Sequence, residues 1–197
     1  RERFSPKSLL LSVAVPEAAI MALLSFGYGI VTVYLSVYAK DEVGITSGTG
    51  YYFSILAAGL VASRLMSAYL LRNGRYVKIF SLGIASVIVS FFIVAFIHNP
   101  VAFFISAAFM GVGYGLITPT AQTMIVNMAE DTERGVANAT YLTFFDIGVG
   151  SGVFVGGLIA QHINYSASYA LSFVLALCAM AYLHLFIKNH FQLRRLK

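Results

Sequence analysis

Two ionisable residues interrupt long apolar stretches of this sequence, and their chemistry is the first indication of function. Asp146 lies about twelve residues into an apolar run that follows Arg134. A charged side chain at the centre of a bilayer costs roughly 2.5–3.5 kcal/mol on insertion scales, so such residues face a bundle interior or water. Asp146 could therefore carry a coupled proton or balance the charge of a substrate. The alternative is a structural carboxylate held by a single partner.

Arg64 is the natural counter-charge to Asp146. It lies about two helical turns from one end of its own apolar run. A guanidinium stays protonated, so it could bind an anionic substrate or keep Asp146 ionised. The alternative is that the Arg64 side chain snorkels, with its head at the membrane interface.

Small and polar residues recur in four apolar runs at a four-three-four spacing, which places them on one face of a helix. The candidate cavity-lining residues are Ser25, Thr32, Ser36, Thr118, Gln122 and Thr143. The first, second, fourth and fifth runs would then surround a polar cavity, and the third and sixth would face lipid. The alternative is close helix packing, in which small residues let backbones approach and hydroxyls bond to their own helix.

Other residues in the runs favour structural roles. Gly148, Gly152 and Gly156 form a ridge of small residues that predicts a helix contact. Pro119 removes one backbone hydrogen bond, so a bend is expected there. The bend could be a gating hinge, and the alternative is a static kink, which is more common. Glu17 follows Pro16, and we interpret it as a helix-start residue.

Motifs for enzymatic chemistry are absent from the sequence. There is no nucleophile elbow, phosphate loop, zinc-ligand spacing or heme motif, and His98, His162, His184 and His190 show no metal spacing. No cofactor and no metal are therefore expected, and the pattern argues against an enzyme.

The composition indicates whether this chain folds in water or in a membrane. Hydrophobic residues make up 59% and charged residues 11% of the 197 residues, and the mean hydropathy is +0.82. Soluble domains carry about 25% charged residues. The chain is therefore predicted to be an integral membrane protein.

Six apolar runs are long enough to cross a bilayer as helices, which takes about 20 residues each. They are too long and continuous for barrel strands. The fold class is predicted to be an all-α membrane protein with spans at 17–39, 48–71, 76–97, 101–128, 135–160 and 166–187.

Basic residues are distributed unevenly about these spans. One side would hold Arg1, Arg3, Lys7, Arg72, Arg75, Lys78, Arg134, Lys188, Arg194, Arg195 and Lys197. The other side would hold only Lys40, with Arg64 inside a span. Positive charge favours the cytoplasmic side, so both termini are predicted to be cytoplasmic. The net charge of +5 follows from this asymmetry, so no nucleic-acid partner is expected.

The chain divides into two blocks of similar length. We expect a cytoplasmic linker end at 1–8, a three-helix repeat at 9–97, a second repeat at 98–187 and a cytoplasmic tail at 188–197. Two three-span blocks have opposite topology, and inverted repeats of this kind recur in transporters.

The link from Ser67 to Phe80, SAYLLRNGRYVKIF, resembles the loop signature G-x-x-x-D-R-x-G-R-[KR] of the major facilitator superfamily. Arg72, Gly74 and Arg75 match, whereas Ser67 replaces the glycine and Leu71 the aspartate. The absent aspartate weakens the case for a charge relay in this loop.

Two later segments extend the resemblance. Glu133–Ala160 is similar to the eleventh helix of efflux-type members, and Gly111–Thr123 is similar to the tenth. The resemblance implies the C-terminal six-helix half of a twelve-helix transporter in the plasma membrane or cell inner membrane.

The leading hypothesis is half of a secondary active exporter of small organic molecules, driven by proton exchange as an antiporter. Its partners would be the lipid bilayer, protons, a small-molecule substrate, and either a missing N-terminal half or a second copy of the chain. The alternative is a non-transporting sensor or scaffold derived from a transporter half.

Overall fold

The computed structural model describes residues 10–194, and these form long helices joined by short turns. The long helices are α1 (Val15–Tyr38), α2 (Gly50–Leu71), α3 (Tyr76–Phe96), α4 (Pro100–Val126), α5 (Arg134–His162) and α6 (Tyr165–Tyr182). The short ones are η2 (Ser12–Ala14), η3 (Ala39–Val43), η4 (Asp131–Glu133), η5 (Leu183–Ile187) and α7 (Lys188–Arg194). The described chain contains no strand, which confirms the all-α class.

Six helical segments are long and apolar enough to cross a membrane. They are Ser12–Val43, Gly50–Leu71, Tyr76–Phe96, Pro100–Val126, Asp131–His162 and Tyr165–Arg194. This confirms six predicted spans and a multi-pass integral membrane protein. The expected linker end at 1–8 lies outside the described residues, as do Arg195 and Lys197 of the expected tail.

Local sequence signals explain several helix boundaries. The Asn99 side chain accepts a hydrogen bond from the backbone N–H of Val101 at 2.8 Å, with Pro100 as the first residue of α4. The Asn164 side chain caps α6 in the same way, through the N–H of Ala167 at 2.7 Å. Gly74 has a φ of 68° and closes the α2–α3 turn, a conformation that favours glycine.

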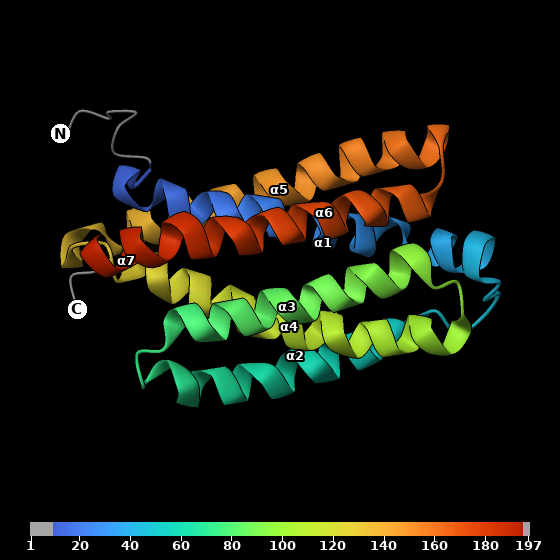
Figure 1. Ribbon diagram of the computed structural model, residues 1–197, viewed down its shortest axis with the longest axis horizontal. Coiled ribbons are helices and arrows are strands. Elements are labelled where there is room, and N and C mark those ends of the chain that lie inside the picture. The colour runs from blue at the N-terminus through green and yellow to red at the C-terminus, as the bar shows by residue number, and fades with distance from the viewer. Residues whose placement is uncertain (1–9, 195–197) are drawn as a thin grey trace.

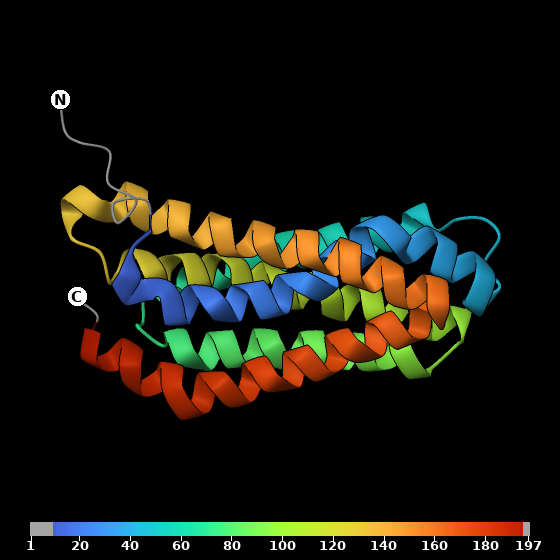
Figure 2. The ribbon, with the colours of Figure 1, turned by 90° about the horizontal axis from the view of Figure 1, so that it is seen from above.

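The helices pair across the midpoint of the sequence. α2 packs chiefly on α4, α5 chiefly on α1, and α3 on both α4 and α6 (Figures 1 and 2). Exchanging the first three helices with the last three converts α2–α4 into α5–α1 and α3–α4 into α6–α1, and these helices also pack together. Two related three-helix units would give this pattern.

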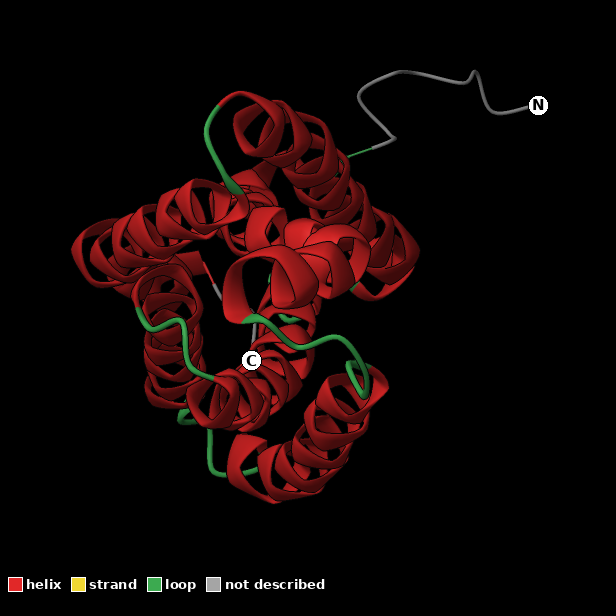
Figure 3. Ribbon diagram, turned by 90° about the vertical axis from the view of Figure 1, so that its right-hand side faces the viewer, coloured by secondary structure: helices red, strands yellow, loops and turns green. Residues whose placement is uncertain are grey.

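The interior lies between α1, α3 and α4. Its largest buried side chains include Tyr38, Phe91, Phe103 and Tyr114. Figure 3 views the bundle end-on, from the side where the α3–α4 and α5–α6 turns lie. Both termini of the described chain and the α2–α3 turn lie at the opposite end (Figure 1).

The end of the last span differs from its prediction. We expected a span ending at 187 and a tail from 188, but α6 continues through the π-helical turn η5 into α7, which ends at Arg194. A π turn has one extra residue per hydrogen-bonded ring and so rotates the helix that follows it. Ile187 and Phe191 are thereby buried against the bundle.

Candidate functional site

Two helices carry faces that nothing in the described chain covers. In the most apolar 18-residue stretch of each helix, only 17% is buried in α2 and in α5. The corresponding share is 61% in the α1 span and 56% in α4. α2 and α5 flank the α1–α4 centre, because each packs chiefly on one of those two helices. The described chain therefore leaves an open surface on α2 and α5, next to α4 and α1.

Arg64 lies on the open surface of α2. Its Nη2 atom donates a long hydrogen bond of 3.5 Å to Oγ1 of Thr118 on α4. The Thr118 hydroxyl in turn donates to the carbonyl of Tyr114 at 2.9 Å. Arg64 forms no ion pair with any residue between 10 and 194. Its charge is therefore not neutralised by any residue of the described chain.

Asp146 is exposed on α5, with the exposed Thr143 one turn before it. Within the described residues, its side chain has neither a hydrogen-bond partner nor a basic partner, and so Arg64 and Asp146 do not form an ion pair. One turn after Asp146, Gly150 lines a cavity of about 720 Å³ that reaches Tyr34 and Tyr165.

The remaining predicted cavity residues divide into two groups. Thr32, Ser36 and Gln122 are exposed, and the Thr32 hydroxyl donates to the carbonyl of Gly29 on its own helix at 2.9 Å. The Gln122 side chain bridges α4 and α5 by donating to Oδ1 of Asn138 at 2.6 Å. Ser25 differs, because it is fully buried.

Ser25 belongs to a contact between α1 and α5. Its hydroxyl donates to the carbonyl of Phe145 at 2.9 Å. A Cβ on Gly148 would overlap the Ser25 hydroxyl, and one on Gly152 would overlap the carbonyl of Phe26. Gly156 faces the Ile30 side chain in the same interface. The structure therefore places Ser25 in helix packing, where it lines no open surface.

Pro119 and the loop motif occupy the positions that the sequence indicated. Pro119 is inside α4, and the Thr123 hydroxyl donates to its carbonyl at 2.7 Å. Arg72 and Gly74 form the turn between α2 and α3, and Arg75 precedes α3. All three loop residues are exposed.

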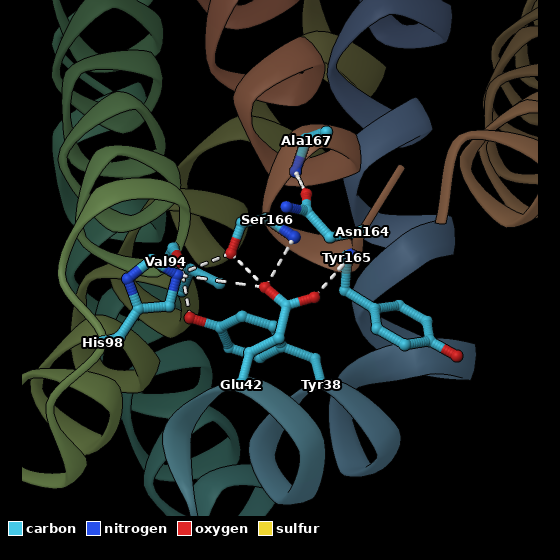
Figure 4. Close-up of polar contacts among 8 residues, drawn as sticks. All are labelled: Tyr38, Glu42, Val94, His98, Asn164, Tyr165, Ser166 and Ala167. Atoms are coloured by element: carbon cyan, nitrogen blue, oxygen red, sulfur yellow. Dashed lines mark hydrogen bonds and ion pairs between the residues drawn. The ribbon is translucent and has the colours of Figure 1, made fainter. Parts of the chain in front are cut away.

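Sequence reasoning missed a polar cluster at the end of α1 (Figure 4). Glu42 in η3 accepts hydrogen bonds from the backbone N–H groups of Tyr165 at 2.6 Å and Ser166 at 3.0 Å, and also from the Ser166 hydroxyl. Nε2 of His98 lies 2.6 Å from the Ser166 oxygen. Since that hydroxyl donates its proton to Glu42, it accepts from the His98 ring.

The Glu42 cluster joins three segments that are far apart in sequence. A carboxylate at the start of α6 satisfies N–H groups that lack a partner in the helix and complements the helix dipole. In the sequence, Glu42 lies just after the predicted span 17–39, beside Asp41. A partner more than 120 residues away leaves no local signal.

A second missed pair lies at the opposite end of the bundle. Glu17 is buried in the first turn of α1, and its Oε1 lies 2.8 Å from Nδ1 of His190 on α7. The helix-start position assigned to Glu17 is correct, but its side chain also fixes the last helix to the first. His190 had been given no role.

Comparisons with known proteins place this architecture. Many solved structures match the fold, among them three of transporters. A mutant of peptide transporter POT with alafosfalin has a TM-score of 0.75 at 18% identity, and the match covers 100% of this chain and 42% of that one. POT with sulfate has a TM-score of 0.74 at 17% identity, with 100% and 41% covered. The POT family transporter PepTSo has a TM-score of 0.68 at 14% identity, with 98% and 39% covered.

The chain thus spans about two fifths of the length of these transporters. A comparison with curated proteins found no match. The family model described as Major Facilitator Superfamily matches residues 18–196. The open α2 and α5 faces, the six-helix architecture and this match agree: the chain belongs to the major facilitator superfamily and has the fold of half such a transporter.

Proposed function

We propose that this chain is the C-terminal half of a secondary active transporter of small organic molecules. The two three-helix units would span 9–97 and 98–187, with both termini cytoplasmic and the protein in the plasma membrane or cell inner membrane. The open faces of α2 and α5 would lie against an N-terminal six-helix half or a second copy of the chain. Rocking of the two halves would expose the site to each side in turn.

One observation carries the proposal. Arg64 and Asp146 are ionisable residues in membrane helices, both exposed on faces that the described chain leaves uncovered. Charges inside a membrane mark substrate or proton pathways. Asp146 would carry the proton or balance a cationic group, and Arg64 would bind an anionic group. Thr32, Ser36, Thr118, Gln122 and Thr143 would line the cavity, Pro119 would act as a hinge, and Arg72, Gly74 and Arg75 would anchor the loop.

The structural neighbours named peptide transporters suggest a peptide-sized substrate, and the resemblance to efflux-type members suggests proton-driven export. The chain can be reconstituted in liposomes that contain a pH-sensitive dye, both alone and together with an N-terminal half. Dialanine and the organic cation ethidium serve as probes. We expect probe-dependent proton flux that Asp146→Asn abolishes and Asp131→Asn, at an exposed residue outside the long helices, preserves.

Two outcomes contradict the proposal. Equal flux in Asp146→Asn and the unmodified protein would reject the role of Asp146. No flux with either probe would favour a non-transporting sensor or scaffold.

A further inference from the structure

The α2–α3 turn and α7 lie at the same end of the bundle (Figure 1). A basic cavity lies at this end. Its volume is about 470 Å³, and its walls come from the start of α3 and from η5 and α7. Arg75, Lys78 and Lys188 line it together with His184, and no acidic residue does. None of the three cations forms an ion pair within residues 10–194. The cavity therefore attracts an anion.

Packing fixes the shape of this cavity. Phe191 is 2% exposed, and its ring meets the Tyr76 ring edge-on with centroids 5.6 Å apart. The Asn127 side chain donates to the Tyr76 hydroxyl at 3.3 Å, which ties this wall to the end of α4. His184 Nε2 lies 3.2 Å from the Ser81 hydroxyl across the cavity wall. The walls are therefore held by aromatic and polar contacts between elements.

An apolar groove begins one helical turn beyond Lys78. It has a volume of about 430 Å³, and its α3 wall includes Leu82, Ala85 and Val89. Lys78 shares this face of α3, because residues three or four apart align on a helix. On the neighbouring α6 and η5, Val174, Leu177, Leu185 and Phe186 are also exposed. A long apolar chain of a ligand can therefore extend from the cations along α3.

We propose that the cavity and groove together bind an anionic phospholipid, with its phosphate among Arg75, Lys78 and Lys188 and an acyl chain along α3. Basic pockets between membrane helices bind lipid headgroups in this way. Free phosphate shares the headgroup chemistry but would make no use of the groove. The lipid site is separate from the Arg64 and Asp146 surface and does not depend on transport.

Native mass spectrometry of the purified protein can count and rank bound lipids. We expect phosphatidylglycerol to bind more tightly than phosphatidylcholine. The triple variant Arg75→Gln, Lys78→Gln, Lys188→Gln should lose roughly 100-fold in phosphatidylglycerol affinity, since it removes all three cations of the cavity. The matched triple variant Arg72→Gln, Arg134→Gln, Arg194→Gln removes the same charge outside the cavity and should keep its affinity.

A second variant tests the acyl groove without changing charge. Ala85→Phe fills the groove and should weaken phosphatidylglycerol binding while leaving binding of inorganic phosphate unchanged. An equal loss of phosphatidylglycerol affinity in the two triple variants would show that general surface charge explains the binding. That result would overturn the proposal. Inorganic phosphate that displaces the lipid completely at low millimolar concentration, with no effect of Ala85→Phe, would reassign the cavity to a free anion.

Discussion

The Nδ1 atom of His190 lies 2.8 Å from Oε1 of Glu17, and this contact joins the last helix of the bundle to the first. Glu17 is 2% exposed, and its other carboxylate oxygen is buried with no hydrogen-bond partner among the described residues. The carboxylate therefore depends on His190 for the polar contact that compensates its burial.

Loss of the histidine should destabilise the protein. His190→Ala leaves a buried carboxylate without its partner, which costs about 1–3 kcal/mol. We expect a lower thermal unfolding midpoint for His190→Ala and little change for His162→Ala, which removes an exposed ring at the end of α5. Equal midpoints for these two variants would show that the Glu17 contact contributes nothing. Glu17→Gln should lower the unfolding midpoint less than His190→Ala does, because an amide oxygen can still accept a hydrogen bond from the histidine ring.

The Glu42 cluster predicts a local effect at the start of α6. Glu42→Ala removes an acceptor shared by two backbone N–H groups and one hydroxyl. A hydrogen bond to a charged group contributes about 1.5–3 kcal/mol. Without these bonds the first turn of α6 should open more often. Hydrogen exchange at Tyr165 and Ser166 should accelerate. Asp41→Ala removes the adjacent, exposed carboxylate and should leave exchange at these amides unchanged.

Alanine substitutions at two glycines of α5 should change the unfolding free energy in opposite directions. A Cβ at Gly152 would overlap the Phe26 carbonyl of α1, whereas a Cβ at Gly150 meets nothing within 4 Å. Gly152→Ala should therefore separate α1 from α5 and lower the unfolding free energy. Gly150→Ala should raise it by about 0.5–1 kcal/mol, because alanine loses less backbone freedom in a helix. Denaturant titration measures both, and a stabilising Gly152→Ala would contradict the close contact.

Most of the fold follows from local features of the sequence. Length and hydropathy predicted six spans, and the link recognised from Arg72, Gly74 and Arg75 is the turn between α2 and α3. The glycines at 148, 152 and 156 indicated a helix contact, because a lack of side chains is visible in sequence. Ser25 could not be distinguished from Thr32 in this way, since both lie on the small or polar stripe and only the position of α5 buries Ser25.

The unpredicted features depend on tertiary structure. The partner of Glu17 lies 173 residues away, and that of Glu42 lies 123 residues away. Glu42 lies in the π-helical turn η3 and His190 lies just after the π-helical turn η5, and no residue type marks either turn in the sequence. The open α2 face was expected from its polar stripe, but the Arg64 contact with Thr118 requires the observed packing of α2 on α4.

Arg64 predicts a charge-specific effect on transport. If its guanidinium binds an anionic group of the substrate, Arg64→Gln removes a charge-assisted hydrogen bond of about 1.5–3 kcal/mol, which raises the KM for dialanine roughly 10- to 100-fold. Arg64→Lys keeps the charge but not the planar guanidinium. Its KM should therefore lie between those of the unmodified protein and Arg64→Gln. Arg194→Gln, at an exposed residue at the end of α7, is the matched control and should leave KM unchanged. A KM for Arg64→Gln equal to that of Arg194→Gln would leave Arg64 with only its contact to Thr118, and snorkelling to the membrane surface would then account for its charge.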